Sequence, residues 1–305
     1  MTAHSQSGSL SAPPQIFDRA LMNQRRARVA ATASGHDFLL KRVAEDFSER
    51  LEAVRRAFPV AADIGAHHGV LGRALTGKVG SKAFISLEET PQLLAQCRGE
   101  RILGHAEALP LAPLSLDLAV SALWLHLIND LPGALLQIRR ALKPDGLLMA
   151  SVLGGATLRE LREAWLTAEA DVLGGASPRV APFADVRDLG GLLQRAGYAL
   201  PVVDSETVNV TYANPLALMR EIKAMGASNM LCERSRRPVS RRLLMRAVEL
   251  YAERFALGNG RVPATFEIIT LTAWVPHDSQ PKPLRPGSAT TRLADVLGTT
   301  EGKLR

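Results

Sequence analysis

The chain has 305 residues, which fits one large or two small globular domains, and 47% of them are hydrophobic, enough to bury a substantial core. This composition excludes intrinsic disorder for most of the chain. Lysine and arginine outnumber aspartate and glutamate by 37 to 30, which gives a formal charge of +7 at pH 7. The two cysteines, Cys97 and Cys232, cannot form a disulfide framework, so we expect a reducing compartment and a cytoplasmic location.

No targeting or membrane-spanning segment is evident. The first 15 residues lack the basic and apolar regions of a signal peptide, and we expect them to form a disordered leader. The most apolar stretch, residues 109–128, has the length of a membrane span but contains two prolines, Asp117 and His126. We therefore expect no transmembrane helix, and at most a peripheral contact with a membrane.

Strand and helix patterns alternate in the first half of the chain. Residues 38–58 carry apolar side chains at helical spacing, which predicts an amphipathic leading helix. Later helices are expected to begin near Pro91 and Asp130, residue types that suit a helix start. Short apolar runs predict strands at residues 58–64, 83–87, 116–123 and 147–153. This alternation indicates an α/β fold with a doubly wound parallel sheet that binds its ligand at the carboxyl ends of the strands.

The second half of the chain has a different pattern. Two β-rich runs, residues 201–211 and 264–275, are expected to pair as an antiparallel edge hairpin. Helices are predicted at residues 157–173, 185–195, 214–226 and 238–255, and the last two form an inserted helical cap. The predicted organisation is a leader (1–15), an N-terminal helical segment (16–58), a core (59–212 and 263–276), a cap (213–262) and a basic, proline-rich tail (277–305) in which only residues 291–297 are expected to be regular.

A glycine-rich turn, Asp63–Gly69, follows the first predicted strand. Its glycines let the backbone approach a ligand, and the helix that follows favours negative charge at its N-terminus. Glu88 ends the next strand, where a carboxylate can accept hydrogen bonds from ribose hydroxyls. Turn and acid together favour a nucleoside-bearing cofactor, although both could be ordinary loop residues. S-adenosylmethionine is favoured over NAD, because a pyrophosphate needs a small residue where His67 stands.

The segments around this turn resemble the class I S-adenosylmethionine-dependent methyltransferases. Asp63–Gly69 is similar to their first motif, Ala106–Leu111 to their loop beside the adenine, and Leu142–Gly146 to their Leu-Lys-Pro-Gly-Gly turn. The resemblance implies their Rossmann-like fold and S-adenosylmethionine as cofactor. It also implies that the cofactor is bound by Asp63, Gly65, Ala66, Gly69, Glu88, Ala106, Glu107 and Ser121.

Other segments resemble a subgroup of this family. Residues 125–132 and 154–162 are similar to relatives of the malonyl-carrier-protein methyltransferase of the biotin pathway. Residues 16–19, 264–268 and 282–287 resemble bacterial relatives of the mitochondrial complex I assembly factor with arginine hydroxylase activity. That resemblance implies a protein substrate, an iron–sulfur subunit of complex I, and hydroxylation of one of its arginines. Methylation of a small or carrier-bound carboxylate and a non-catalytic role in assembly remain the alternatives.

Candidates for reacting groups follow the fourth and fifth predicted strands. His126 could act as a general base near neutral pH, or could pack beneath the next helix. Asp130 is a second candidate catalyst, although it suits the N-cap of that helix better. Arg162 could clamp a carboxylate, or could lie on a solvated helix face. Trp124 and Asn129 are further candidates in the same region.

Two histidines depart from the methyltransferase pattern, and this is expected to weaken donor binding. His67 replaces a glycine that lies against the methionine part of the donor, and His105 replaces an aspartate before the adenine loop. His105, Glu107 and His126 imitate the two-histidine, one-carboxylate set of non-haem iron sites, but we expect no metal site. The pair His67 and His68 is weaker still as a metal site, since neighbouring side chains rarely converge.

Basic residues are concentrated between Cys232 and Arg246. The segment could dock an acidic partner, or could form the solvated flank of a helix. A nucleic acid partner is not favoured, because no interleaved aromatic residues or known binding module accompany the charge. The arginines concerned are Arg234, Arg236, Arg237, Arg241, Arg242 and Arg246.

Overall fold

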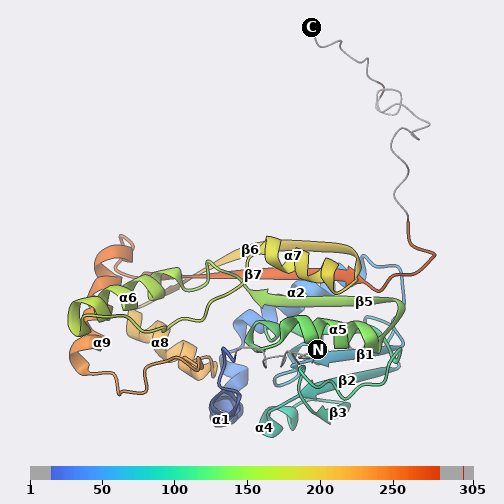
Figure 1. Cartoon of the computed structure of the whole chain (residues 1–305), viewed down its shortest axis with the longest axis horizontal. Helices are drawn as coiled ribbons and strands as arrows, with labels where there is room; N and C mark the ends of the chain where they lie inside the picture. Colours follow the sequence, from blue (N-terminus) through green and yellow to red (C-terminus); the bar gives the residue numbers. More distant parts are fainter. Residues whose placement is uncertain (1–14, 282–297, 299–305) are drawn as a thin grey trace, which may run out of the picture.

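A seven-stranded sheet forms the centre of the molecule in the computed structural model, which describes residues 15–281 and residue 298 (Figure 1). The strand order is β3-β2-β1-β4-β5-β7-β6. All but the last residue of the predicted leader, the regular segment predicted at residues 291–297 and most of the predicted tail lie outside the described residues.

Five strands are parallel, as predicted. Four of them match the predicted apolar runs, but the edge strand β3 was not predicted, because it is short, two of its four side chains are charged and none is buried. The strand β5 begins directly after a helix and includes Leu142–Gly146, which resembles the methyltransferase turn. The parallel strands are β1 (Val60–Ile64), β2 (Ala83–Glu88), β3 (Glu100–Leu103), β4 (Leu116–Ala122) and β5 (Leu142–Leu153).

The predicted antiparallel edge is confirmed. β6 (Ala199–Tyr212) pairs with β7 (Val262–Trp274), with Val208 opposite Phe266, and β7 pairs in turn with β5. Both strands are long, and they extend past the parallel strands to the helices of the cap (Figure 1). The hairpin therefore carries the cap at the carboxyl edge of the parallel sheet.

Helices cover both faces of the sheet. α2 (Phe38–Glu52) and α3 (Val70–Leu75) share one hydrophobic cluster with β1 and β4, and α5 (Leu131–Ala141) and α7 (Val186–Arg195) share a second cluster on the opposite face. The sheet is therefore buried on both sides, which explains why its central strands are mostly apolar.

The cap contains three helices. They are α6 (Arg159–Leu173), α8 (Pro215–Ala224) and α9 (Arg241–Phe255), and α6 packs on α9. The predicted cap segment contained only α8 and α9. Burial of Trp165 and Tyr251 in the first hydrophobic cluster joins the cap to the core.

The N-terminal segment crosses from the core to the cap. α1 (Arg19–Val29) is capped by Asp18, whose side chain accepts a hydrogen bond from Leu21 N, and a 3₁₀ helix, η1 (Ala30–Gly35), follows. Phe17 pairs as an isolated β-bridge with Leu231, between α8 and α9. A short helix, α4 (Pro91–Leu94), lies between α1 and β2.

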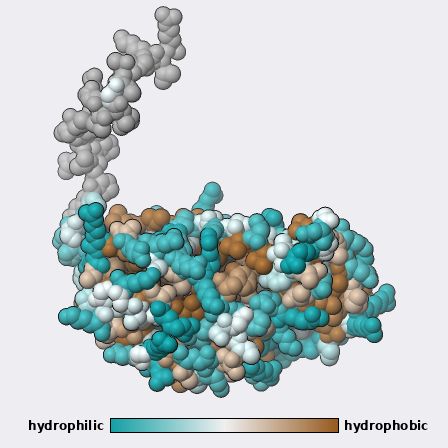
Figure 2. Space-filling model, turned by 180° about the vertical axis from the view of Figure 1, so that it is seen from behind, coloured by the Kyte–Doolittle hydropathy of each residue, from teal (hydrophilic) through white to brown (hydrophobic). Residues whose placement is uncertain are grey.

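The apolar stretch at residues 109–128 crosses the core and is not one long helix. It forms a loop, β4 and the 3₁₀ helix η2 (Leu125–Leu127). Across residues 15–281, no helix combines the length and the apolar character that crossing a membrane requires. On the back of the molecule, hydrophobic side chains form separate groups among hydrophilic ones (Figure 2).

Candidate functional site

A cavity of about 460 Å³ lies between the carboxyl edge of the sheet and the cap. The core contributes residues at or just after the ends of β1, β4 and β5, including Gly65, Trp124 and Leu153, and the cap contributes side chains such as Trp165 and Met219. Most of the lining is apolar. This is the edge at which doubly wound sheets bind their ligands.

Ionisable side chains in the cavity wall have partners. Asp37 forms an ion pair with Lys41 at 2.7 Å and lies 3.0 Å from His68 Nε2. Arg179 pairs with the buried Glu169 at 2.5 Å and lies over the ring of Trp165. The pairing leaves the wall close to electrically neutral.

The glycine turn has the conformation that its sequence requires. Gly65 and Gly69 have φ angles of 78° and 81°, where glycine is favoured, and Gly65 N and Ala66 N donate hydrogen bonds to Leu87 O at 2.9 Å. A side chain of the protein covers the turn. A Cβ atom on Gly65 would lie 2.0 Å from Cγ of Trp124, so the indole covers this glycine directly.

Glu88 is fully buried at the end of β2 and has three hydrogen-bond donors. His67 N donates to Oε2 and Thr90 N donates to Oε1, each at 2.9 Å. The third donor is Arg26 of α1, whose Nη2 lies 2.7 Å from Oε2. The Arg26 guanidinium also lies 4.1 Å from the centre of the Trp124 ring.

Asp63 lies at the end of β1 and is 1% exposed. Neither carboxylate oxygen has a hydrogen-bond partner among the described residues. Burial, together with the charge of Glu88, raises the pKa of Asp63 well above its usual value.

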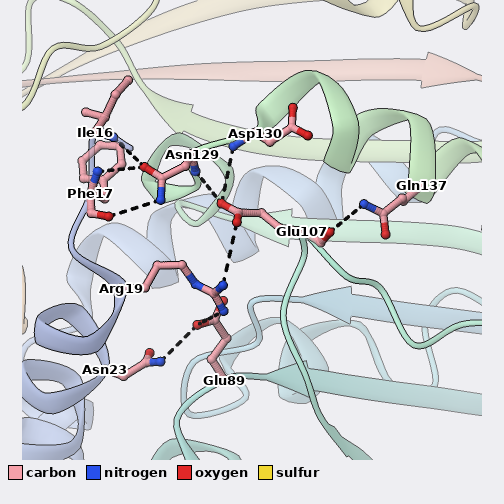
Figure 3. Close-up of polar contacts among 9 residues, drawn as sticks. All are labelled: Ile16, Phe17, Arg19, Asn23, Glu89, Glu107, Asn129, Asp130 and Gln137. Atoms are coloured by element: carbon pink, nitrogen blue, oxygen red, sulfur yellow. Dashed lines mark hydrogen bonds and ion pairs between the residues drawn. The ribbon is translucent and has the colours of Figure 1, made fainter. Parts of the chain in front are cut away.

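The remaining predicted cofactor residues serve the fold in this arrangement. Ser121 Oγ donates to Ile64 O at 2.6 Å and so joins β4 to β1. Ala106 is fully buried. Glu107 Oε1 accepts hydrogen bonds from Asn129 N at 2.5 Å and from Asp130 N at 3.4 Å (Figure 3).

The three predicted catalytic residues are not brought together. His126 lines the cavity, and burial lowers its pKa to about 3, so the ring is neutral. Its Nδ1 accepts a hydrogen bond from Leu153 N at 3.4 Å, which favours a proton on Nε2 and hence a donor toward the cavity. Asp130 caps α5 through Gly133 N at 2.8 Å, and Arg162 donates to the carbonyl oxygens of Gly155 and Thr157 at 3.2 Å.

The two adjacent histidines do converge, contrary to expectation. His67 Nδ1 lies 2.7 Å from His68 Nδ1, and His67 has a φ of 52°. Burial lowers the pKa of both rings, and the charge of Arg26 adds to the effect at His67. Across residues 15–281, no three or more His, Cys, Asp or Glu side chains are grouped so that they could hold a metal ion, including His105, Glu107 and His126.

These contacts test whether the site fits S-adenosylmethionine. The surfaces that the sequence assigns to the donor, the Gly65 backbone and the Glu88 carboxylate, are covered by Trp124 and Arg26. In this arrangement the residues present do not fit the cofactor. Asp63, which has no partner, is the one predicted donor-site side chain still free to accept a new hydrogen bond.

Comparison with known proteins identifies the family of this chain. Residues 62–150 match the family model described as "Methyltransferase domain". Arginine-hydroxylase NDUFAF5 of Danio rerio is 36% identical over 292 residues, which cover 92% of this chain and 89% of that protein. The malonyl-[acyl-carrier protein] O-methyltransferase of Methylovorus sp. is 34% identical and covers 88% and 93%. The chain belongs to the family of methyltransferase-fold enzymes that contains both.

Solved structures agree on the fold. The YcgJ protein of Bacillus subtilis superposes with a TM-score of 0.54 at 14% identity, covering 77% of this chain and 98% of that one. A putative methyltransferase from Bacillus halodurans gives 0.53, also at 14% identity, and covers 76% and 98%. This NDUFAF5-related chain therefore has the class I methyltransferase fold that its sequence predicts.

Three residues of the site were not singled out in the sequence. Arg26 stands in a run of arginines, and its position four residues after the buried Met22 is the only signal that it faces inward. Asp37 and Arg179 lie in loops far from the glycine turn in sequence. They reach the cavity only because α2 and the loop after α6 pack at its rim.

Proposed function

We propose that this enzyme hydroxylates an arginine of the iron–sulfur subunit during the assembly of complex I. The observation that carries the proposal is the extent of the similarity to the NDUFAF5 arginine hydroxylases, since it covers 92% of this chain. The methyltransferase domain accounts only for residues 62–150. The similarity therefore includes the cap and the N-terminal segment, which shape the cavity.

In this proposal the substrate arginine enters the cavity beneath the cap. Trp165, Phe183 and Phe266 line it, and the face of an aromatic ring attracts a guanidinium group. Asp37 is the only carboxylate in the wall as far as the structure describes it, and it could exchange Lys41 for the substrate cation. The Nε2 proton of His126 would orient an acceptor atom. Insertion of oxygen also consumes an oxidant, which protein side chains do not supply.

We also propose S-adenosylmethionine or its demethylated product as the ligand of the glycine turn, once Arg26 and Trp124 have moved from it. A reducing, cytoplasmic location and the absence of a nucleic acid partner belong to the same proposal. The two cysteines, which are both free in the structure, support a reducing compartment.

The proposal is tested by the mass of the iron–sulfur subunit purified from wild-type, deletion and His126→Ala strains. We expect the wild-type subunit to carry one additional oxygen atom on an arginine, and the other two subunits to lack it. His277→Ala is the matched control, because this histidine is exposed and remote from the cavity. Identical subunit masses in wild-type and deletion strains would contradict a catalytic role on this subunit.

Methyl transfer is the second candidate. It is supported by the 34% identity to the Methylovorus malonyl-[acyl-carrier protein] O-methyltransferase over 93% of that protein. A methyl increment on a carrier-bound carboxylate, with no oxygen on the subunit, would favour it. Impaired assembly of complex I without any change of mass would favour a non-catalytic assembly factor.

A further inference from the structure

Two side chains of the protein stand on the surfaces assigned to the donor. Trp124 follows β4, is 1% exposed and covers the Gly65 backbone. Arg26 comes from α1, its side chain is 7% exposed, and it binds the Glu88 carboxylate at 2.7 Å. The guanidinium lies over the indole at 4.1 Å, so the two form one unit, which we call the plug.

The plug leaves polar groups unsatisfied. Buried side-chain atoms without a partner among the described residues include both oxygens of Asp63, Trp124 Nε1, Arg26 Nε and Thr90 Oγ1. All of them belong to plug residues or to residues at the ends of β1 and β2. A buried polar atom without a hydrogen bond is costly, so the plugged arrangement does not satisfy this site fully. A ligand with hydroxyl and amino groups could satisfy more of these atoms.

The backbone that carries Trp124 is strained. Leu123 has a φ of 49°, in the left-handed region that a branched residue rarely adopts. Its N–H donates to Ser151 O at 2.9 Å, which holds it to β5. A rearrangement of the Leu123–Trp124 backbone would release strain of this kind.

The Arg26 half of the plug depends on the position of α1. Polar side chains at the carboxyl edge hold the start of this helix, and we call them the clasp: Glu89, Glu107 and Asn129 (Figure 3). Asn129 Oδ1 accepts hydrogen bonds from the backbone N–H groups of Ile16 and Phe17, both at 2.8 Å.

The acidic members of the clasp bind α1 side chains. Glu89 accepts a hydrogen bond from Asn23 at 3.2 Å and pairs with Arg19 at 3.5 Å, and Glu107 lies 3.8 Å from Arg19 (Figure 3). Arg19 is 36% exposed, so these pairs are accessible to water and each contributes little. The clasp can therefore open without unfolding the core.

We propose that the plug is an internal occupant of the nucleoside site, and that S-adenosylmethionine or its demethylated product binds only after α1 is released and Trp124 turns away. The proposal rests on the donor part of the proposed function. The apparent affinity is then the intrinsic affinity multiplied by the fraction of molecules in the open state. Changes that open the plug or the clasp increase binding.

The first test is calorimetric titration of the full chain with S-adenosylhomocysteine. Trp124→Ala and Arg26→Gln remove halves of the plug, and Asn129→Ala loosens the clasp without touching the donor surfaces. We expect each to bind at least about tenfold more tightly than wild type, as removal of a competing closed state predicts. Arg28→Gln is the matched control, since it changes the same charge on the exposed side of α1 and should bind as wild type.

The second test follows Trp124 itself. In a chain with Trp165→Phe and Trp274→Phe, quenching of the remaining tryptophan by acrylamide should increase when S-adenosylhomocysteine is added, because the buried indole becomes exposed.

The outcomes of these tests distinguish the claim about the plug from the claim about donor binding. Equal, tight binding by wild type and all variants, or ligand binding with unchanged quenching, would overturn the plug and leave donor binding intact. No binding by wild type or by any folded variant would overturn both the plug and the donor part of the proposed function, while the mass of the iron–sulfur subunit still tests the hydroxylase independently.

Discussion

Single buried side chains set the electrostatics of the site. Burial keeps His126 and His67 neutral and raises the pKa of Asp63, so the groups nearest the glycine turn avoid carrying charge of their own. Arg26 and Glu88 form a buried ion pair beside this turn. Removal of one member of such a pair is strongly destabilising, since its partner is left buried and unpaired.

Asp63 gives a prediction about stability and pH. A carboxyl group whose pKa is raised in the folded state stabilises the fold below its unfolded pKa, and this contribution is lost as pH rises toward the folded pKa. Asp63→Asn removes the ionisable group and keeps its shape. We expect the variant to be at least as stable as wild type at pH 7, by about 1.4 kcal/mol for each unit of the pKa shift, and this advantage to shrink toward pH 4.

Urea unfolding of both proteins across this pH range measures the difference. Ser115→Ala, a substitution of a polar residue in a loop, serves as a control for general effects of acid. A loss of stability in Asp63→Asn at neutral pH would show that the folded protein binds the ionised carboxylate.

At the scale of elements, several predicted site residues hold helices and strands in place. Ser121 joins β4 to β1, and Arg162 binds carbonyl oxygens just before α6. Asp130 caps α5, and the backbone N–H groups beside it are held by Glu107. These contacts position the loop after β4, which carries Trp124 and His126 into the cavity.

Substitutions of Asp130 distinguish a role in capping α5 from a role in catalysis. Asparagine caps helices about as well as aspartate, whereas alanine costs about 0.5–2 kcal/mol at this position. We expect Asp130→Asn to retain both stability and the oxygen added to the iron–sulfur subunit, and Asp130→Ala to lose stability in urea unfolding. Loss of product in a stable Asp130→Asn protein would instead assign the carboxylate to catalysis.

At the scale of the molecule, the N-terminal segment couples the cap to the core. Residues 16–18 bind both Asn129 and the segment after α8, so a movement of α1 would affect the donor site and the cavity together. The basic segment adjoins this junction. Arg234 pairs with Asp18, and Arg246 pairs with Asp171 of α6, so these two arginines serve the structure.

The other four arginines of the segment are exposed and have no ion pair within residues 15–281, and we expect them to dock an acidic partner. Reversal of their charge should weaken capture of the iron–sulfur subunit, most strongly at low salt, because such steering is screened by ions. The change is the fourfold substitution to glutamate of Arg236, Arg237, Arg241 and Arg242.

A pull-down of the purified subunit at low and high salt measures this effect. The control reverses four exposed arginines elsewhere and so produces the same net charge. Equal capture by the two variants would mean that only total charge matters and that this segment is a solvated flank. The control positions are Arg98, Arg101, Arg140 and Arg187.

The hydrophobic pattern of neighbouring residues was sufficient to predict most of the fold. Strands buried on both faces are apolar along their length, and helices between them show a single apolar face, so the sheet, its antiparallel edge and the cap helices could be predicted from neighbouring residues. The edge strand β3 was not predicted, because its exposed side chains show no such pattern. Helix ends were less accurate, and α2 ends at Glu52 where the prediction extended to Phe58.

The state of the donor site could not be predicted in this way. The sequence shows Gly65 and Glu88 at the ends of two strands, and that placement follows from the alternation of strand and helix. Arg26 is 62 residues from Glu88, and its contact exists only because α1 packs across the carboxyl edge. Whether a buried surface meets a ligand or a side chain of the same protein depends on how distant elements dock, since close packing leaves room for only one of them.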